Sequence, residues 1–206
     1  MASREFPRHL LDLETLTREQ IETLLDLAAR FKHERAKARA GEPPRGRRSL
    51  LSGRTVITLF FEHSTRTRSS FEVAARSLGA DVLSFQKDAS SVAKGESLED
   101  TVRNLDAIGA DALVVRHPAA GAPRLVARAV RASVINGGDG AHEHPTQGLL
   151  DLYTIRERFG RVQGLKVAIV GDIANSRVAR SNLWGLTKLG AEVILVGPPT
   201  LLPRSF

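Results

Sequence analysis

Short apolar runs of strand length alternate with longer amphipathic stretches along most of the chain, and this alternation restricts the fold more than any other feature. Strands are predicted at residues 55–61, 80–85, 112–117 and 133–135. Helices are predicted at residues 17–39, 67–78, 98–108 and 122–130. Strands that alternate with helices form parallel sheets with helices packed on their faces. The sequence therefore predicts an α/β fold, with a parallel sheet flanked by helices over roughly residues 45–140.

A second unit of the same kind follows a long predicted helix. The helix is expected at residues 146–159, a strand at 166–171, a helix at 176–189 and a strand at 192–197. Because two strands and one helix cannot bury both faces of a parallel sheet, we interpret this unit as the start of a second Rossmann-like α/β domain. We expect a first domain at 1–145, an interdomain helix at 146–160 and an incomplete domain at 161–206. The alternative is that the last two strands extend the first sheet.

Composition excludes several classes of protein. The chain contains no Cys, which excludes disulfide scaffolds, thiolate nucleophiles and Cys-ligated metals and favours a reducing compartment. The longest apolar runs, such as residues 167–170, are far shorter than the roughly 20 residues of a membrane helix. Charged residues interrupt the N-terminus before a signal-peptide core can form. We expect a cytoplasmic protein without a membrane partner.

The net charge of +7 raises the question of a nucleic-acid partner. The densest basic cluster spans residues 30–48, which also contain Gly41, Pro43, Pro44 and Gly46. We interpret this cluster as a solvated helix tail and loop, with a phosphate-backbone patch as the alternative. Aromatic side chains do not alternate with these cations, so stacking of single-stranded bases is not expected. The sequence predicts no nucleic-acid partner.

The most informative polar segment lies where the strand at 55–61 ends and the next helix begins. It reads Ser64-Thr65-Arg66-Thr67. The first N–H groups of a helix lack internal partners and its dipole is positive there, so this junction attracts anions. The hydroxyls add donors, and the Arg66 guanidinium suits phosphate oxygens. We predict a phosphate site; plain helix capping beside surface arginines is the alternative.

Other polar residues follow further strands of the same predicted sheet. Arg116 ends the strand at 112–117, and His144 and Gln147 follow the glycine-rich segment after the strand at 133–135. Open α/β sheets bind ligands at the carboxyl ends of their strands, so a shared pocket is expected there. Each residue taken singly also has an explanation that involves no ligand. Arg116 could pair with a carboxylate, and His144 could cap a helix. His142 and His144 are spaced poorly for a metal, and we predict none.

These segments resemble the aspartate and ornithine carbamoyltransferases. The resemblance rests on residues 60–68 with 70–72, 116–118, 139–140 and 144–147, and it extends over about residues 9–200. Thr146, where the ornithine enzymes usually have Cys, makes the chain resemble the aspartate branch of the family. The resemblance implies a carbamoyl-phosphate domain followed by an aspartate domain, joined by long helices.

The resemblance also implies roles for individual residues. The phosphate would be bound by Ser64, Thr65, Arg66 and Thr67. Thr67, Arg116 and His144 would contact the carbamoyl oxygen, and Gln147 the carbamoyl nitrogen. Arg66, Thr67, Arg116 and His144 would be catalytic.

Further implied residues concern the acceptor and the assembly. Arg177 and Lys94 would bind aspartate, and Ser90 and Lys94 would enter the site of a neighbouring subunit, as in a homotrimer with shared sites. Whether this trimer belongs to a larger assembly is left open. A second Arg, a Gln and a Leu-Pro segment of the family lie beyond residue 206. The implied reaction is carbamoyl transfer from carbamoyl phosphate to L-aspartate in pyrimidine synthesis, without a cofactor.

Three other functions remain open at this point. The first is a non-catalytic subunit that supports an assembly, and the second is an ornithine-type carbamoyltransferase. The third is a nucleotide-binding oxidoreductase based on residues 167–172, although this run lacks the Gly-x-Gly-x-x-Gly spacing.

Overall fold

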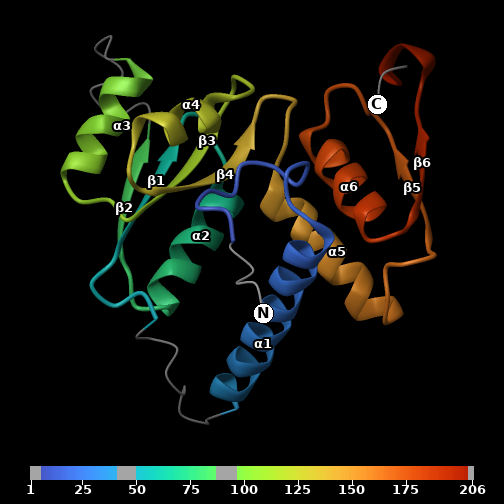
Figure 1. Ribbon diagram of the computed structural model, residues 1–206, viewed down its shortest axis with the longest axis horizontal. Helices are drawn as coiled ribbons and strands as arrows, with labels where there is room; N and C mark the ends of the chain where they lie inside the picture. The colour runs from blue at the N-terminus through green and yellow to red at the C-terminus, as the bar shows by residue number, and fades with distance from the viewer. Residues whose placement is uncertain (1–5, 41–49, 87–96, 204–206) are drawn as a thin grey trace.

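The computed structural model describes residues 6–40, 50–86 and 97–203 and confirms the predicted alternation (Figure 1). In chain order the elements are α1 (Arg18–Arg39), β1 (Thr55–Phe60), α2 (Thr65–Ser77), β2 (Asp81–Gln86), α3 (Leu98–Ala107), β3 (Ala112–His117), α4 (Ala122–Ala129), β4 (Ser133–Asp139), α5 (Pro145–Phe159), β5 (Lys166–Val170), α6 (Arg177–Lys188), β6 (Glu192–Val196) and the 3₁₀ turn η4 (Pro199–Leu201). Within these ranges no helix combines the length and apolarity needed to cross a membrane.

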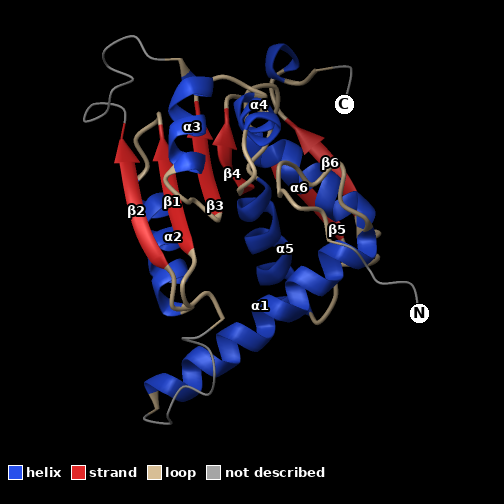
Figure 2. Ribbon diagram, turned by 60° about the vertical axis from the view of Figure 1, so that its left-hand side comes forward, coloured by secondary structure: helices blue, strands red, loops and turns tan. Residues whose placement is uncertain are grey.

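The first sheet has the strand order β2-β1-β3-β4, and its neighbouring strands are parallel. Side chains alternate between its two faces. Ile57 and Leu113 pack against α3 and α4 on one face, whereas Val56 and Val114 pack with Ala75 of α2 on the other. Figure 2 shows the helices on both faces. The central strands β1 and β3 are therefore buried on both sides, as their apolar residues predict.

The last two strands form a separate parallel sheet. Their inner residues, among them Val167, Ile169 and Val193, pack on a core shared with α1, α5 and α6. The opposite face exposes Val170 and Ile194. Because β5 and β6 pair only with each other among the described strands, they do not extend the first sheet, and the alternative considered for them is wrong.

The segment before α1 connects the two units. Leu10 pairs with β4, since its N–H donates to Val134 and its carbonyl accepts from Asn136. Nζ of Lys188, at the end of α6, donates to the carbonyls of Leu13 at 2.9 Å and Leu16 at 2.6 Å. The first part of the chain therefore contacts both the first sheet and the last helix.

The observed ends of two elements differ from the predicted ones by more than one residue. Helix α2 begins at Thr65 rather than residue 67, because Ser64 has an extended backbone (φ −159°, ψ 90°) and the helix starts directly after it. Strand β4 continues to Asp139 rather than ending at residue 135, and its end pairs with His117 of β3. As a result, Thr65 and Arg66 belong to the first turn of α2, and Asn136 and Asp139 belong to the carboxyl end of β4.

Helices α5 and α6 approach closely at a glycine, and this contact gives a stability prediction. A Cβ at Gly148 would lie 2.8 Å from Cδ1 of Leu13 and 3.0 Å from Cβ of Ser181. Gly148→Ala should therefore lower the free energy of unfolding by about 1–2 kcal/mol, despite the better helix propensity of Ala. Urea denaturation measures the change. Leu150→Ala on the exposed side of α5 is the control, and equal stability of both variants and the parent would contradict this packing.

Candidate functional site

The carboxyl edge of the first sheet brings together segments that follow β1, β3 and β4. Phe60 is the register partner of Arg116, and His117 is that of Asp139. The N–H of Phe61 donates to the Arg116 carbonyl at 2.9 Å, so the ladder extends one residue beyond β1. The carboxyl ends of β1, β3 and β4 therefore share one edge of the sheet, as predicted, and the residues that follow these strands lie around this edge.

The N-terminus of α2 leaves its polar groups available to a ligand. Ser64 is the N-cap residue, but its hydroxyl makes no capping hydrogen bond. Thr65 and Arg66 are exposed and Thr67 is half-buried, and all three lie in the first helical turn. The alternative of side-chain capping by Ser64 is therefore not observed, and the turn can accept an anion at its N–H groups.

Glu62 joins two guanidinium groups at the centre of this edge. Its Oε2 lies 3.3 Å from Nε of Arg116, and its two oxygens accept from Nη1 and Nη2 of Arg177 at 2.9 and 3.2 Å. Partial burial raises the pKa of Glu62, but the hydrogen bonds and charges of Arg177 and Arg116 outweigh it and leave this pKa below its ordinary value. Arg116 thus does pair with a carboxylate, and the local sequence did not indicate that Glu62 is its partner.

A glycine makes room for the two arginines. Gly138 has φ +114°, and a Cβ there would lie 3.0 Å from Nη1 of Arg177 and 3.1 Å from Nη1 of Arg116. Arg116 also donates from Nη1 to the carbonyl of Gly137 at 3.1 Å. The glycines that ended the predicted strand are therefore part of the site.

His144 is buried at the N-cap position of α5. Burial lowers its pKa to about 4, and the positive charges of Arg116 and Arg177 act in the same direction. The imidazole is consequently neutral at pH 7 and has one ring N–H to donate. A neutral donor beside a guanidinium is suited to an oxygen that gains negative charge during a reaction. The predicted capping alternative is not observed, since His144 makes no side-chain cap bond.

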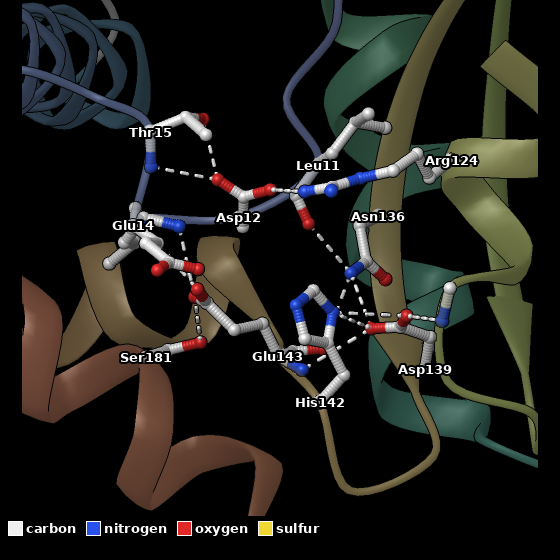
Figure 3. A network of polar contacts seen from close by, with 12 residues as sticks. Leu11, Asp12, Glu14, Thr15, Arg124, Asn136, Asp139, His142, Glu143 and Ser181 are labelled. Carbon is white, nitrogen blue, oxygen red and sulfur yellow. Dashed lines mark hydrogen bonds and ion pairs between the residues drawn. The ribbon is translucent and has the colours of Figure 1, made fainter. Parts of the chain in front are cut away.

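The loop before His144 is fixed by a polar network that the sequence did not reveal (Figure 3). The buried Glu143 accepts from the N–H of Leu13 at 2.9 Å and from the Ser181 hydroxyl at 2.8 Å. The same hydroxyl accepts from the N–H of His144 at 2.9 Å. Burial raises the pKa of Glu143, and these hydrogen bonds offset part of that effect. Nothing in the local sequence around Ser181 indicated this contact, because its partners lie far away in the chain.

Asp139 fixes the other side of the same loop. It accepts from the N–H of Gly121 at 2.6 Å and from Nδ2 of Asn136 at 2.7 Å. Nδ1 of His142 lies 3.2 Å from both of its oxygens, and this hydrogen bond raises the pKa of His142 against the opposing effect of burial. The loops after β3 and β4 are thereby held together.

The remaining predicted residues divide into two groups. Gln147 lies in the first turn of α5 and donates from Nε2 to Oδ1 of Asp151 at 2.9 Å. Ser90 and Lys94 lie outside the described residues, so their roles stay predictions. In the ranges that the structure describes, no group of three His, Asp or Glu side chains is placed to hold a metal ion.

Comparison with protein families gives a match over most of the chain. Residues 8–157 match the family model described as "Aspartate/ornithine carbamoyltransferase, carbamoyl-P binding domain". The aspartate carbamoyltransferase catalytic subunit of Moorella thermoacetica is 56% identical over 196 residues, which are 95% of this chain and 62% of that protein. The chain thus spans about 60% of the length of the curated relatives that it matches.

Solved structures of the same family have the same fold. An aspartate transcarbamoylase of Trypanosoma cruzi, in complex with carbamoyl phosphate and aspartate, matches with a TM-score of 0.86 and 39% identity, covering 95% of this chain and 60% of that one. The ornithine carbamoyltransferase of Pyrococcus furiosus matches with a TM-score of 0.84 and 38% identity, covering 96% and 59%. The α/β architecture is therefore that of carbamoyltransferases with either acceptor.

The opposite pKa shifts of two neighbouring histidines can be measured by NMR. His144 should titrate near pH 4, whereas His142 should titrate above its ordinary value, because only His142 contacts a carboxylate. Ring resonances are assigned with His142→Asn and His144→Asn. Since unfolding restores an ordinary pKa, His144 lowers stability as the pH falls from about 6.5 toward 4. Titration of both rings near pH 6.5 would contradict the site geometry.

Proposed function

The chain belongs to the aspartate/ornithine carbamoyltransferase family, and on this premise we propose that it takes part in carbamoyl transfer from carbamoyl phosphate to L-aspartate. The products are N-carbamoyl-L-aspartate and phosphate, as in pyrimidine synthesis. The observation that supports this proposal most is the neutral, buried His144 in the electrostatic field of Arg116, at the edge where α2 begins. This arrangement has donors for a phosphate and, separately, for an acyl oxygen.

The N-terminal turn of α2 is the proposed phosphate subsite. Its N–H groups, the hydroxyls of Ser64, Thr65 and Thr67, and the Arg66 guanidinium supply donors to the phosphate oxygens. Because these groups are fixed or charged, they stabilise the negative charge that the leaving phosphate gains.

The carbamoyl group is proposed to lie between this turn and α5. Thr67, Arg116 and His144 donate to its oxygen, and Gln147 accepts from its nitrogen. The amine of the acceptor forms a bond with the carbonyl carbon, the carbon–oxygen bond to phosphate breaks, and phosphate leaves with that electron pair. Since a histidine with a pKa of about 4 is a weak base at pH 7, the departing phosphate takes the proton of the amine.

Arg177 is the proposed contact for an aspartate carboxylate, together with Lys94. A carboxylate of the acceptor would take the place that Glu62 has at Arg177. The Arg177 guanidinium favours L-aspartate over L-ornithine as the acceptor. Thr146, the residue in which the chain resembles the aspartate branch of the family, points to the same acceptor. Both substrates are fixed side by side, and this proximity supplies much of the rate enhancement without a cofactor.

The assembly is also a proposal. Ser90 and Lys94 would complete the site of a neighbouring copy, which requires a closed oligomer, and the family resemblance makes this a homotrimer. We also propose the cytoplasm as its location and the expected division at residues 145 and 160 as the domain organisation. Carbamoyl phosphate and L-aspartate are the proposed small-molecule partners.

The role of Arg66 is tested by binding of inorganic phosphate. Arg66→Ala should weaken binding by about tenfold or more, because a hydrogen bond to a charged group contributes about 1.5–3 kcal/mol. Isothermal titration calorimetry measures the dissociation constants. Arg76→Ala removes an exposed arginine from the other end of the same helix and is the matched control. Equal losses in the two variants would contradict a phosphate subsite at the N-terminus of α2.

The polypeptide of these 206 residues should bind carbamoyl phosphate weakly and show negligible turnover. The resemblance assigns further acceptor contacts to residues beyond position 206, so L-aspartate is held incompletely. Radiolabelled carbamoyl phosphate with L-aspartate, and with L-ornithine in parallel, measures product formation. Robust carbamoylation of L-aspartate by this polypeptide would contradict the prediction, and carbamoylation of L-ornithine alone would replace the proposed acceptor.

A further inference from the structure

Three polar side chains form a series of hydrogen bonds between α5 and α6. Nε2 of Gln147 donates to Oδ1 of Asp151 at 2.9 Å, one turn further along α5. Nδ2 of Asn182, on α6, donates to Oδ2 of the same carboxylate at 2.7 Å. Asp151 therefore receives one amide N–H on each of its two oxygens.

This arrangement determines which atom of the Gln147 amide is left for a ligand. A carboxylate has only acceptor atoms, so the NH₂ group of Gln147 faces it and the oxygen cannot. Because the amide is planar, Oε1 then points away from Asp151. A glutamine without such a partner can rotate its amide and offer either a donor or an acceptor.

The hydrogen bond between Asn182 and Asp151 restrains both side chains. Oδ1 of Asn182 is buried and has no hydrogen-bond partner among the described residues, yet a rotated amide would place this oxygen against Oδ2 of Asp151. The carboxylate thus fixes the orientation of both amides. Asp151 is half-buried, so its side chain is also restrained by the packing of α5 against α6.

We propose that Asp151 is a positioning residue that makes Gln147 a hydrogen-bond acceptor and so selects acyl phosphates with an NH₂ group on the acyl carbon. This inference rests on the proposed function, in which Gln147 contacts the carbamoyl nitrogen. An acyl phosphate with a methyl group at this position leaves Oε1 without a donor. One with an anionic oxygen there is repelled by Oε1. A site that is built to pair an N–H rejects analogues that lack it, because its own polar atom stays unpaired.

The test compares three ligands on the intact 206-residue chain. Dissociation constants are measured for carbamoyl phosphate, acetyl phosphate and inorganic phosphate with the parent, Asp151→Asn and Gln147→Ala. Asparagine keeps the shape of Asp151 but offers a donor and an acceptor, so it no longer orients Gln147. The preference for carbamoyl over acetyl phosphate should fall by about fivefold in both variants, the effect of one hydrogen bond of about 1 kcal/mol. Binding of inorganic phosphate should not change.

A purely structural role of Asp151 would give a different result. A loss of packing would weaken the binding of all three ligands by the same factor. The ratio of the dissociation constants for carbamoyl and acetyl phosphate would then stay unchanged, and this result would overturn the inference. Asp26→Asn is the matched control, since Asp26 is an exposed carboxylate that pairs with Arg156 on the far side of α5. It should change none of the three dissociation constants.

The outcomes separate this inference from the proposed function. A reduced ratio in Gln147→Ala with an unchanged ratio in Asp151→Asn overturns the role of Asp151 and retains the carbamoyl site. A parent chain with no preference for carbamoyl over acetyl phosphate overturns both. Should Asp151→Asn fail to fold, Asn182→Ala tests the same point. It leaves the carboxylate in place but frees it to rotate, and it should lower the same ratio by a smaller factor, whereas an unchanged ratio overturns the inference.

Discussion

The pairing of one carboxylate with two guanidinium groups is the interaction on which the rest of the site depends. Arg116 comes from the first sheet and Arg177 from α6, and both crowd against Gly138. Two partly buried guanidinium groups that lie against the same glycine repel each other, and an anion between them offsets this repulsion. Glu62 is that anion, and it therefore holds the start of α6 against the end of β1. Burial is the main cause of the low pKa of His144, and the positive charges of the same two arginines lower this pKa further, so His144 is neutral at this edge.

The fold could be predicted from the sequence because its apolar pattern is local. The central strands β1 and β3 of the first sheet are buried on both faces, and such strands read as continuous apolar runs whatever their neighbours are, whereas the edge strand β2 is partly exposed. The start of α2 was predicted two residues late, since Thr65 and Arg66 are exposed and contribute nothing to the apolar period. The end of β4 was missed because Gly137 and Gly138 are typical of turns. Here both stay in the strand, and Gly138 leaves space for the guanidinium groups of Arg116 and Arg177.

The site could be predicted only in part, for a physical reason. Hydroxyls and an arginine at a strand–helix junction have a chemistry that is evident from the local sequence, and the same holds for Arg116 and His144. The partners that fix them are distant in the chain. Glu62 contacts Arg177, and Glu143 contacts Leu13 and Ser181, through pairings that only the tertiary structure creates. A carboxylate next to a motif is visible in the sequence, but the cation that it pairs with is not.

Three carboxylates of different origin accept hydrogen bonds from side chains in the N-terminal half of α6. Glu62 follows β1, Glu143 precedes α5 and Asp151 lies within α5, and their donors are the side chains of Arg177, Ser181 and Asn182. Arg177 and Ser181 are four residues apart and so share a side of α6, whereas Asn182, the next residue, lies about 100° further round the helix. In the proposed function, an acceptor carboxylate would replace Glu62 at Arg177 and would change the partner of Arg177 only. The contacts at Ser181 and Asn182 remain, so α6 keeps its place beside His144 and Gln147 while the charge at its N-terminus is exchanged.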